Sequence, residues 1–392
     1  MGLVYPLSMS HKSRFGLFLS TLLTGFALFC LFSVTAQAAR IGKQPPSVKK
    51  PNIDFTGFVI TGYRYTFNDT TLLRLGDSDG FYMRNARLKV TASVLHFRAV
   101  LTMDGSYDFG ADSDDVSPST RMMRFHLRDA YLDYRPSNGL RIRVGQMKIP
   151  FGYNYERAAA ESHFAAFPLW LSGGDITFEY QSRAAYRRRD IGLSVGFEKQ
   201  LNSMFGLSAN AMVYNGNGEN RFANDSDLPA VAARISAKIG PAGGWYLSVS
   251  GNVMYNPRVT GEQPALYQEN DLIFGGDVRF EVAGFFVEAE GIYRTTDLAT
   301  VGRQETSLGF HADIGYRIKS IGLEPVVRFD FYDPSSQLDD DELMYLTIGV
   351  NWYYTILGRH TVALRLSYTL KIENEKRTLN NDQVNLQLQY SF

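Results

Sequence analysis

Apolar and polar residues alternate along most of this 392-residue chain, and short connections alternate with long ones between the alternating segments. Period-two alternation places successive side chains on opposite faces of a β-strand. That periodicity alone does not separate a soluble sheet, with its polar face outside, from a membrane barrel, with its apolar face toward lipid. The order of the connections does separate the two folds, because nothing in a soluble sandwich requires all long loops to lie at one end.

The alternating segments predict 16 strands, an even number, as in single-chain outer-membrane barrels. Closure of such a sheet leaves no unpaired strand edge facing lipid. The predicted fold class is all-β: a single 16-stranded antiparallel transmembrane β-barrel with a long constriction loop after the fifth strand. The expected strands are 53–65, 81–93, 95–107, 123–135, 139–147, 187–199, 204–214, 229–239, 244–255, 271–282, 284–295, 306–318, 320–332, 343–355, 359–371 and 382–392.

The N-terminus has the layout of a secretory signal peptide. Lys12 and Arg14 precede an uncharged, mostly apolar run, and Ala36-Gln37-Ala38 is an A-x-A cleavage site. The alternative, a retained transmembrane helix, rests on the length of the apolar run. The expected domains are a signal peptide at 1–38, a periplasmic lead-in at 39–52 and a β-barrel at 53–392.

Charge and cysteine content narrow the function. The chain carries 40 basic and 40 acidic residues, without the basic excess expected of a nucleic-acid binder. Loss of the signal removes Lys12 and Arg14 and no acid, which leaves a net charge of about −2. The one cysteine, Cys30, lies in the signal, so we expect a mature chain with no disulfide and no thiolate metal site. We expect no cofactor and no nucleic-acid partner.

The longest connection, 148–186, carries more aromatic residues than a fully solvated loop usually does. They include Phe151, Tyr153, Tyr155, Phe164, Phe167 and Trp170. We expect the connection to fold inward and narrow the pore; the alternative is an external cap or a contact between copies. Its charges are balanced, with five basic and five acidic residues between positions 150 and 190.

Period two also assigns charged side chains to the inner wall. On the second to fifth strands they are Arg87, Lys89, Arg98, Arg141 and Arg143, with Asp104, Asp129 and Asp133. On the tenth to thirteenth they are Asp277, Arg279, Glu281, Glu288, Glu290, Asp313, Arg317, Glu324, Arg328 and Asp330. We name these the basic arc and the acidic arc. Opposite charges across a pore select solutes by charge.

The candidate pore-lining and solute-binding residues are Arg87, Lys89, Arg98, Arg141, Arg143 and, from the long connection, Arg157. For any one of them the alternative is a charge that only keeps the lumen hydrated. In the fourth strand the alternation places Arg128 on the same face as Leu132, which predicts a β-bulge.

Catalytic and metal motifs find little support. Gly192-Leu193-Ser194-Val195-Gly196 matches G-x-S-x-G, but alternation continues through it, whereas a nucleophile elbow needs a sharp strand-to-helix turn. We therefore expect no enzyme. Two acidic outer connections could bind divalent cations near lipopolysaccharide, although solvation is the simpler role. They hold Asp112, Asp114 and Asp115, and Asp339, Asp340, Asp341 and Glu342.

Three stretches resemble the phosphate-selective porin O and P family: Arg84-Asn85-Ala86-Arg87-Leu88, Leu127-Arg128-Asp129-Ala130-Tyr131-Leu132-Asp133-Tyr134, and Arg141 to Gly152 with its G-Q-x-K-x-P-F run. Arg189-Asp190-Ile191-Gly192 is similar to that family's return from the constriction loop, and Phe392 resembles the terminal assembly signal of outer-membrane barrels. The resemblance implies a 16-stranded, usually trimeric, passive anion channel with an arginine ladder and a lysine cluster.

The sequence thus predicts an outer-membrane porin of a Gram-negative-type bacterium, in contact with lipid and lipopolysaccharide. It would conduct small solutes passively, with a preference for anions. The family resemblance implies that phosphate is among these anions and that the protein forms a homotrimer. The alternatives are a general or cation-preferring porin and an outer-membrane barrel enzyme.

Overall fold

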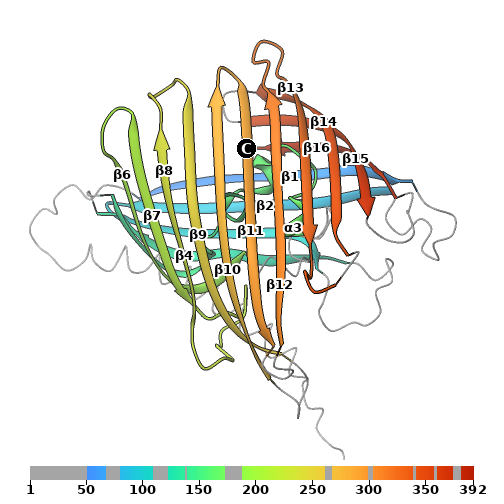
Figure 1. Ribbon diagram of the computed structural model, residues 1–392. Coiled ribbons are helices and arrows are strands. Elements are labelled where there is room, and N and C mark those ends of the chain that lie inside the picture. The colour runs from blue at the N-terminus through green and yellow to red at the C-terminus, as the bar shows by residue number, and fades with distance from the viewer. Residues whose placement is uncertain are drawn as a thin grey trace, which may run out of the picture. The chain divides into compact units, whose positions relative to one another are not determined.

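The described part of the protein folds as one closed β-barrel (Figure 1). This computed structural model describes residues 51–67, 80–108, 122–136, 139–172, 188–260, 267–298, 303–338, 341–356, 360–373 and 381–392. Within these ranges 16 antiparallel strands each pair with their neighbours in sequence, and β1 (Asn52–Thr66) pairs with β16 (Gln383–Ser391) to close the sheet. The predicted fold class is confirmed. The expected signal peptide and most of the expected lead-in lie outside the described residues.

The other strands are β2 (Gly80–Val94), β3 (Phe97–Asp108), β4 (Met122–Tyr134), β5 (Leu140–Lys148), β6 (Arg189–Gln200), β7 (Phe205–Tyr214), β8 (Ala230–Ile239), β9 (Tyr246–Thr260), β10 (Tyr267–Val282), β11 (Phe285–Leu298), β12 (Arg303–Tyr316), β13 (Leu323–Asp333), β14 (Leu343–Ile356) and β15 (His360–Glu373). Between β5 and β6 lie α2 (Tyr153–Glu156), η2 (Ala159–Glu161) and α3 (Leu169–Ser172). Because consecutive strands are antiparallel, β1 begins and β16 ends at the same end of the barrel, the turn end. The connection from β5 to β6 lies at the other, the loop end.

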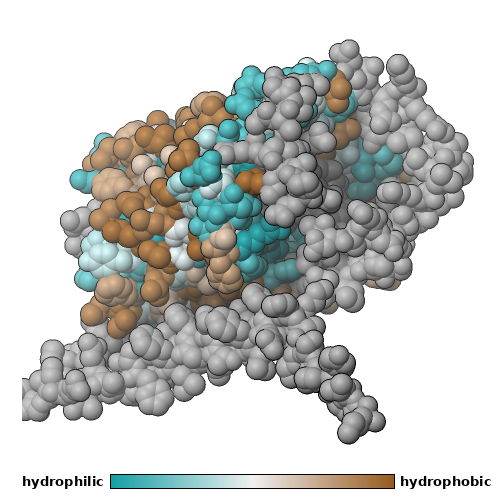
Figure 2. Space-filling view, turned by 90° about the horizontal axis from the view of Figure 1, so that it is seen from below, coloured by the Kyte–Doolittle hydropathy of each residue, from teal (hydrophilic) through white to brown (hydrophobic). Residues whose placement is uncertain are grey.

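The two faces of the sheet are inverted relative to a soluble protein. In β16, Leu386, Leu388 and Tyr390 are 43%, 47% and 42% exposed, whereas Gln387 and Gln389 between them are 0% and 4% exposed. Figure 2 shows the same arrangement, with apolar side chains on the outer flank and polar ones where the surface is hollowed. Such a surface is stable when the apolar face meets lipid and the polar face meets water. No helix in the described part of the chain is long and apolar enough to cross a membrane.

Several strands reach further toward the loop end than the sequence predicts. The expected ends at 255 and 271 give way to a ladder that continues until Thr260 pairs with Tyr267. Asn256 and Pro257 favour turns, but Asn256 is fully buried and the pairing runs through both residues. The connections 261–266 and, between β11 and β12, 299–302 are therefore shorter than expected. The expected alternation of short and long connections therefore does not hold between β9 and β12.

The predicted bulge in the fourth strand is present. Thr102 pairs with Asp129 and Met103 with Leu127, so that Arg128 is an extra residue on β4. A bulge turns two successive side chains toward the same side. Arg128, which is 4% exposed, and Asp129 both contact side chains of the inner wall.

Candidate pore and the segment inside it

The connection after β5 enters the barrel directly. Its described part, residues 149–172, is called the inner segment here; residues 173–187 lie outside the described ranges. The segment turns at Gly152, which has a φ of +63° and lies against the Glu290 carboxylate on β11. A side chain at position 152 would need the space that this carboxylate occupies, so the run Pro150-Phe151-Gly152 allows the chain to approach the wall closely.

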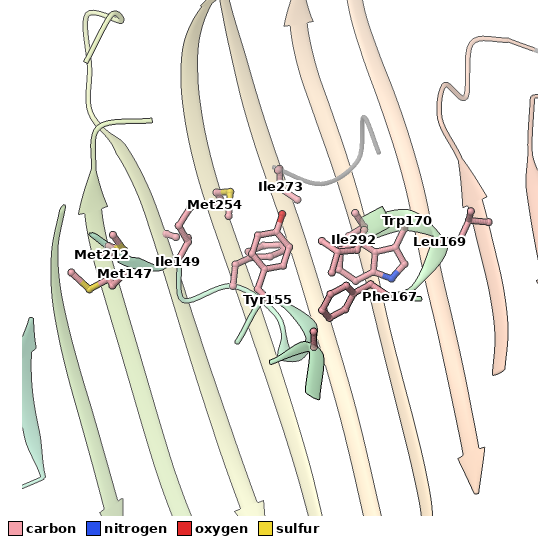
Figure 3. Packing of buried hydrophobic residues seen from close by; sticks show 14 of the residues in the cluster. Met147, Ile149, Tyr155, Phe167, Leu169, Trp170, Met212, Met254, Ile273 and Ile292 are labelled. Carbon is pink, nitrogen blue, oxygen red and sulfur yellow. The ribbon is translucent and has the colours of Figure 1, made fainter. Parts of the chain in front are cut away.

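The inner segment packs on an apolar surface of the inner wall (Figure 3). We call this surface the apolar shelf; it comprises Met212 and Tyr214 of β7, Ala230 and Ala232 of β8, Met254 of β9, Ile273 of β10 and Ile292 of β11. Phe151, Tyr155 and Trp170 of the segment are each 0% exposed. Complete burial of one large apolar side chain stabilises by about 1.5–3 kcal/mol. Three such residues fix the segment to the wall.

Carboxylates of β11 hold the first half of the inner segment. Glu290 Oε2 accepts hydrogen bonds from Asn154 Nδ2 at 2.7 Å and from the Asn154 backbone N–H at 3.1 Å. Arg157 Nη1 donates to Glu288 Oε2 at 2.9 Å. Burial alone would lower the pKa of Arg157, but the Glu288 carboxylate raises it, so the guanidinium stays charged.

His163 bridges two strands of the acidic arc. Its Nδ1 lies 2.8 Å from Glu324 Oε1 on β13, and its Nε2 lies 3.2 Å from Glu288 Oε1 on β11. A neutral imidazole donates from one nitrogen, so both contacts are hydrogen bonds when the ring is protonated. Asn351 of β14 donates to the His163 carbonyl at 2.8 Å. The segment is thus tied to three strands at one residue.

The second half of the inner segment is tied to β12 and β13. These bonds run from the Leu169 N–H to Asp330 Oδ1 at 2.9 Å, from Trp170 Nε1 to His311 Nδ1 at 3.2 Å, and from Arg328 Nη1 to the Ala166 carbonyl at 3.1 Å. Arg328 is also bonded to both oxygens of Asp313 at 2.7 Å. Many carboxylates of the acidic arc are therefore bonded either to the inner segment or to arginines of the same arc.

A cavity of about 550 Å³ lies between the inner segment and the opposite wall. Its charged lining residues are Arg87, Lys89, Arg141, Arg143, Lys148 and Arg189 against Asp129, Glu156 and Glu161. Six basic residues thus face three acidic ones, and two of these acids, Glu156 and Glu161, come from the segment. The lining of this cavity carries a basic excess that the whole chain does not.

The cavity brings together four of the six candidate pore residues: Arg87, Lys89, Arg141 and Arg143. Arg98 is not among its lining residues and pairs in register with Asp133 on β4. Arg157 is bound to Glu288 and lines a separate cavity of about 300 Å³ on the other side of the segment. Sequence spacing could not separate Arg157 from the basic arc, because its position depends on how the segment turns.

Lys148 and Arg189 are cavity residues that the candidate set omits. Alternation from Arg141 and Arg143 places Lys148 on the lipid side, but Gly145 has a φ of +126° and the alternation changes there. Arg189 Nε donates to Asp129 Oδ1 at 2.8 Å. A glycine inside an otherwise regular strand was the available signal, since it often marks a bulge or bend.

Ser194 lies within β6 and donates to Asn210 Oδ1 at 2.8 Å. The strand continues on both sides, so this residue is not at a strand-to-helix elbow. Of the acidic outer connections, Asp112, Asp114, Asp115, Asp339 and Asp340 lie outside the described residues.

Comparison with known proteins identifies the family of this chain. Residues 61–255, about half of the chain, match the sequence profile of the family described as phosphate-selective porin O and P. The chain belongs to this family. The resemblance of its motifs is confirmed, and the barrel is an outer-membrane porin that forms a channel. No curated protein sequence matches it.

Solved structures share the porin fold. The anion-selective porin from Comamonas acidovorans has a TM-score of 0.56 and 13% identity, over 88% of this chain and 100% of its own. The outer-membrane channel DcaP of Acinetobacter baumannii has a TM-score of 0.54 and 17% identity, over 88% and 99%. The trimer form of OmpT from Vibrio cholerae has a TM-score of 0.56 and 10% identity, over 88% and 100%. At these identities the likeness establishes the fold.

Proposed function

We propose that this porin conducts small anions, phosphate among them, in preference to cations. The observation that carries the proposal is the unequal use of the two walls. The acidic arc binds the inner segment, whereas the basic arc borders the open cavity. A solute that crosses the lumen therefore meets Lys89, Arg141 and Arg143 without an equal number of free carboxylates.

Arg143 is held in a position suited to oxyanions. Its Cζ lies 5.3 Å from the ring centre of Tyr131, whereas Nε and Nη2 of Arg87 are already bonded to Asp104 Oδ2. An aromatic ring against the guanidinium face leaves its N–H edge for planar, bidentate contacts with phosphate or carboxylate. Glu156 and Glu161 of the inner segment line the same cavity, opposite the basic arc. The electric field therefore runs across the pore, and we expect only a modest preference for anions.

The proposal also covers orientation and assembly. The turn end faces the periplasm and the loop end faces outward, as in outer-membrane barrels generally. A homotrimer is proposed by analogy with the trimer form of OmpT. Light scattering on the detergent-solubilised protein tests the trimer, and N-terminal sequencing of the protein purified from membranes tests removal of residues 1–38.

Reversal potentials in a potassium chloride gradient across planar bilayers test the anion preference. We expect a chloride-selective parent. Arg141→Gln with Arg143→Gln should lower the anion-to-cation permeability ratio roughly threefold at low salt, since two charges act across a water-filled lumen. The change should shrink at high salt, where screening is strong.

Lys199→Gln with Arg221→Gln removes the same charge from two exposed residues outside the cavity lining and serves as the matched control. A parent with a reversal potential near zero would favour the general-porin alternative. A control shift equal to that of the cavity pair would show that net charge, and not the basic arc, sets selectivity.

A further inference from the structure

The connection between β7 and β8, residues 215–229, bends back onto the wall formed by β4, β5 and β6. Asp190 of β6 is 0% exposed, and its Oδ2 accepts hydrogen bonds from the Gly216 N–H at 3.0 Å and the Gly218 N–H at 2.8 Å. The two glycines have φ values of +93° and +86°, which other residues adopt at a cost. One buried carboxylate thus fixes the path of this turn.

Gln146 of β5 fixes the other side of the turn. Its Nε2 donates to the carbonyls of Leu127 at 2.7 Å and Arg128 at 3.0 Å, at the bulge in β4. Its Oε1 accepts the Asn220 N–H at 2.7 Å. Asn220 has a φ of +63°, a conformation that is uncommon for a residue with a side chain. Gln146 therefore connects the bulge to the β7–β8 connection.

Glu219 lies between these two attachments. Its Oε1 accepts a hydrogen bond from Arg128 Nη1 at 2.7 Å. The side chains of Arg128 and Glu219 are 5% and 19% exposed, so the pair is largely shielded from water. Arg128 Nε also lies 3.5 Å from Asp104 Oδ2, which places the pair next to the basic arc.

We propose that residues 216–220 form a second inserted turn that brings the Glu219 carboxylate to Arg128 and so determines how strongly the basic arc attracts anions. Glu219 is a specificity-determining residue, and Asp190 and Gln146 are positioning residues that act through the turn. The direction of the effect rests on the proposed anion preference: the carboxylate offsets one arginine at the loop-end side of the arc.

The first test removes the charge and keeps the shape. Glu219→Gln should raise the anion-to-cation permeability ratio roughly twofold at low salt, because it removes one negative charge from beside the basic arc. Asp227→Asn removes one charge from an exposed residue of the same connection and is the matched control. Equal shifts for the two variants would overturn the assignment of Glu219.

The second test separates positioning from charge. Asp190→Asn should increase hydrogen–deuterium exchange in peptides that cover residues 215–222. It should also reduce the effect of Glu219→Gln to less than half when the two are combined. An unchanged Glu219→Gln effect in this background would overturn the role of Asp190.

Failure of this proposal can be distinguished from failure of the proposed function. An unselective or cation-selective parent would refute the anion preference. The difference between Glu219→Gln and Asp227→Asn would still test the inserted turn, because both variants alter charge in the same direction.

Discussion

The two walls of the barrel carry charges of opposite sign and use them differently. On β11 to β13, carboxylates and arginines are bonded to one another or to the inner segment, as Glu288, Asp330 and Arg328 are. On β2 to β5, Lys89, Arg141 and Arg143 face a cavity of about 550 Å³. A charge that a bonded partner neutralises adds little to the field that a solute meets, whereas a charge that faces the solution adds to that field. The same residue types therefore serve different purposes on the two sides of one pore.

This comparison explains how a chain of nearly zero net charge can hold a cavity with a basic lining. The inner segment covers acidic residues and leaves basic ones accessible. Under the proposed function, selectivity depends on the placement of the segment as much as on the composition of the wall. Changes to the acidic wall should alter stability and conductance, and changes to the basic wall should alter selectivity.

The largest expected effect comes from removing the inner segment. Replacing residues 153–172 with a short Gly-Ser linker should at least double single-channel conductance, because the lumen widens, and should abolish anion preference, because the acidic arc becomes accessible. Deletion of 224–228, part of an exposed connection, is the control. Unchanged conductance in the first variant would mean that the segment does not narrow the pore.

Trp170→Ala should detach the second half of the segment from its wall. The side chain is 0% exposed and bonded to His311, so the loss should be about 3–5 kcal/mol in the free energy of unfolding. Trp352→Ala, at a residue 40% exposed on the outer face, should cost less. Urea unfolding in detergent, followed by tryptophan fluorescence, measures both, and equal losses would contradict the docking of the segment.

Paired carboxylates on the two walls offer a direct comparison. Asp313→Asn leaves buried Arg328 without its ionic partner and should destabilise by about 3 kcal/mol, with little change in selectivity. Asp129→Asn, which unpairs Arg189 beside the cavity, should cost less stability and raise anion preference. If both variants lost the same stability and changed selectivity equally, the two walls would not differ as described.

The smallest expected effect is at His163. His163→Asn cannot reach both Glu288 and Glu324, and should cost about 1–2 kcal/mol of stability with noisier single-channel current. His360→Asn is the control, since that residue is half-buried and its ring is bonded to Tyr390 on the outer surface. Identical current noise in the two variants would count against a role for His163 in holding the segment still.

Much of the barrel could be predicted from the sequence because its pattern is local. Period two locates the strands, and the parity error around Arg128 located the bulge. The two charged arcs follow from the same parity. The strand ends at the loop side could not be found in this way, because Asn256 and Pro257 resemble a turn while pairing continues through them.

Other features depend on contacts distant in sequence. Met212, Ala232 and Met254 lie on the inner face, where period two leads one to expect polar residues, and they belong to the same buried cluster as the apolar residues of the segment. Lys148 enters the cavity because Gly145 changes the alternation. No local pattern indicates which charged side chains the inner segment covers. The sequence therefore could not predict which charges of the wall remain accessible to a solute.

The seam between β1 and β16 has a consequence for the order of folding. Pairing such as Val59 with Tyr390 joins the two ends of the barrel domain, and the Gly57 N–H is bonded to the Phe392 carbonyl at 2.9 Å. Contacts between residues this far apart form late, because the entropy of closing the chain must first be overcome. The apolar shelf lies on β7 to β11, away from the seam, so a curved open sheet can receive the inner segment before it closes. Late pairing of β1 with β16 would then close the barrel around an inner segment that is already packed. The segment would not have to enter a closed barrel.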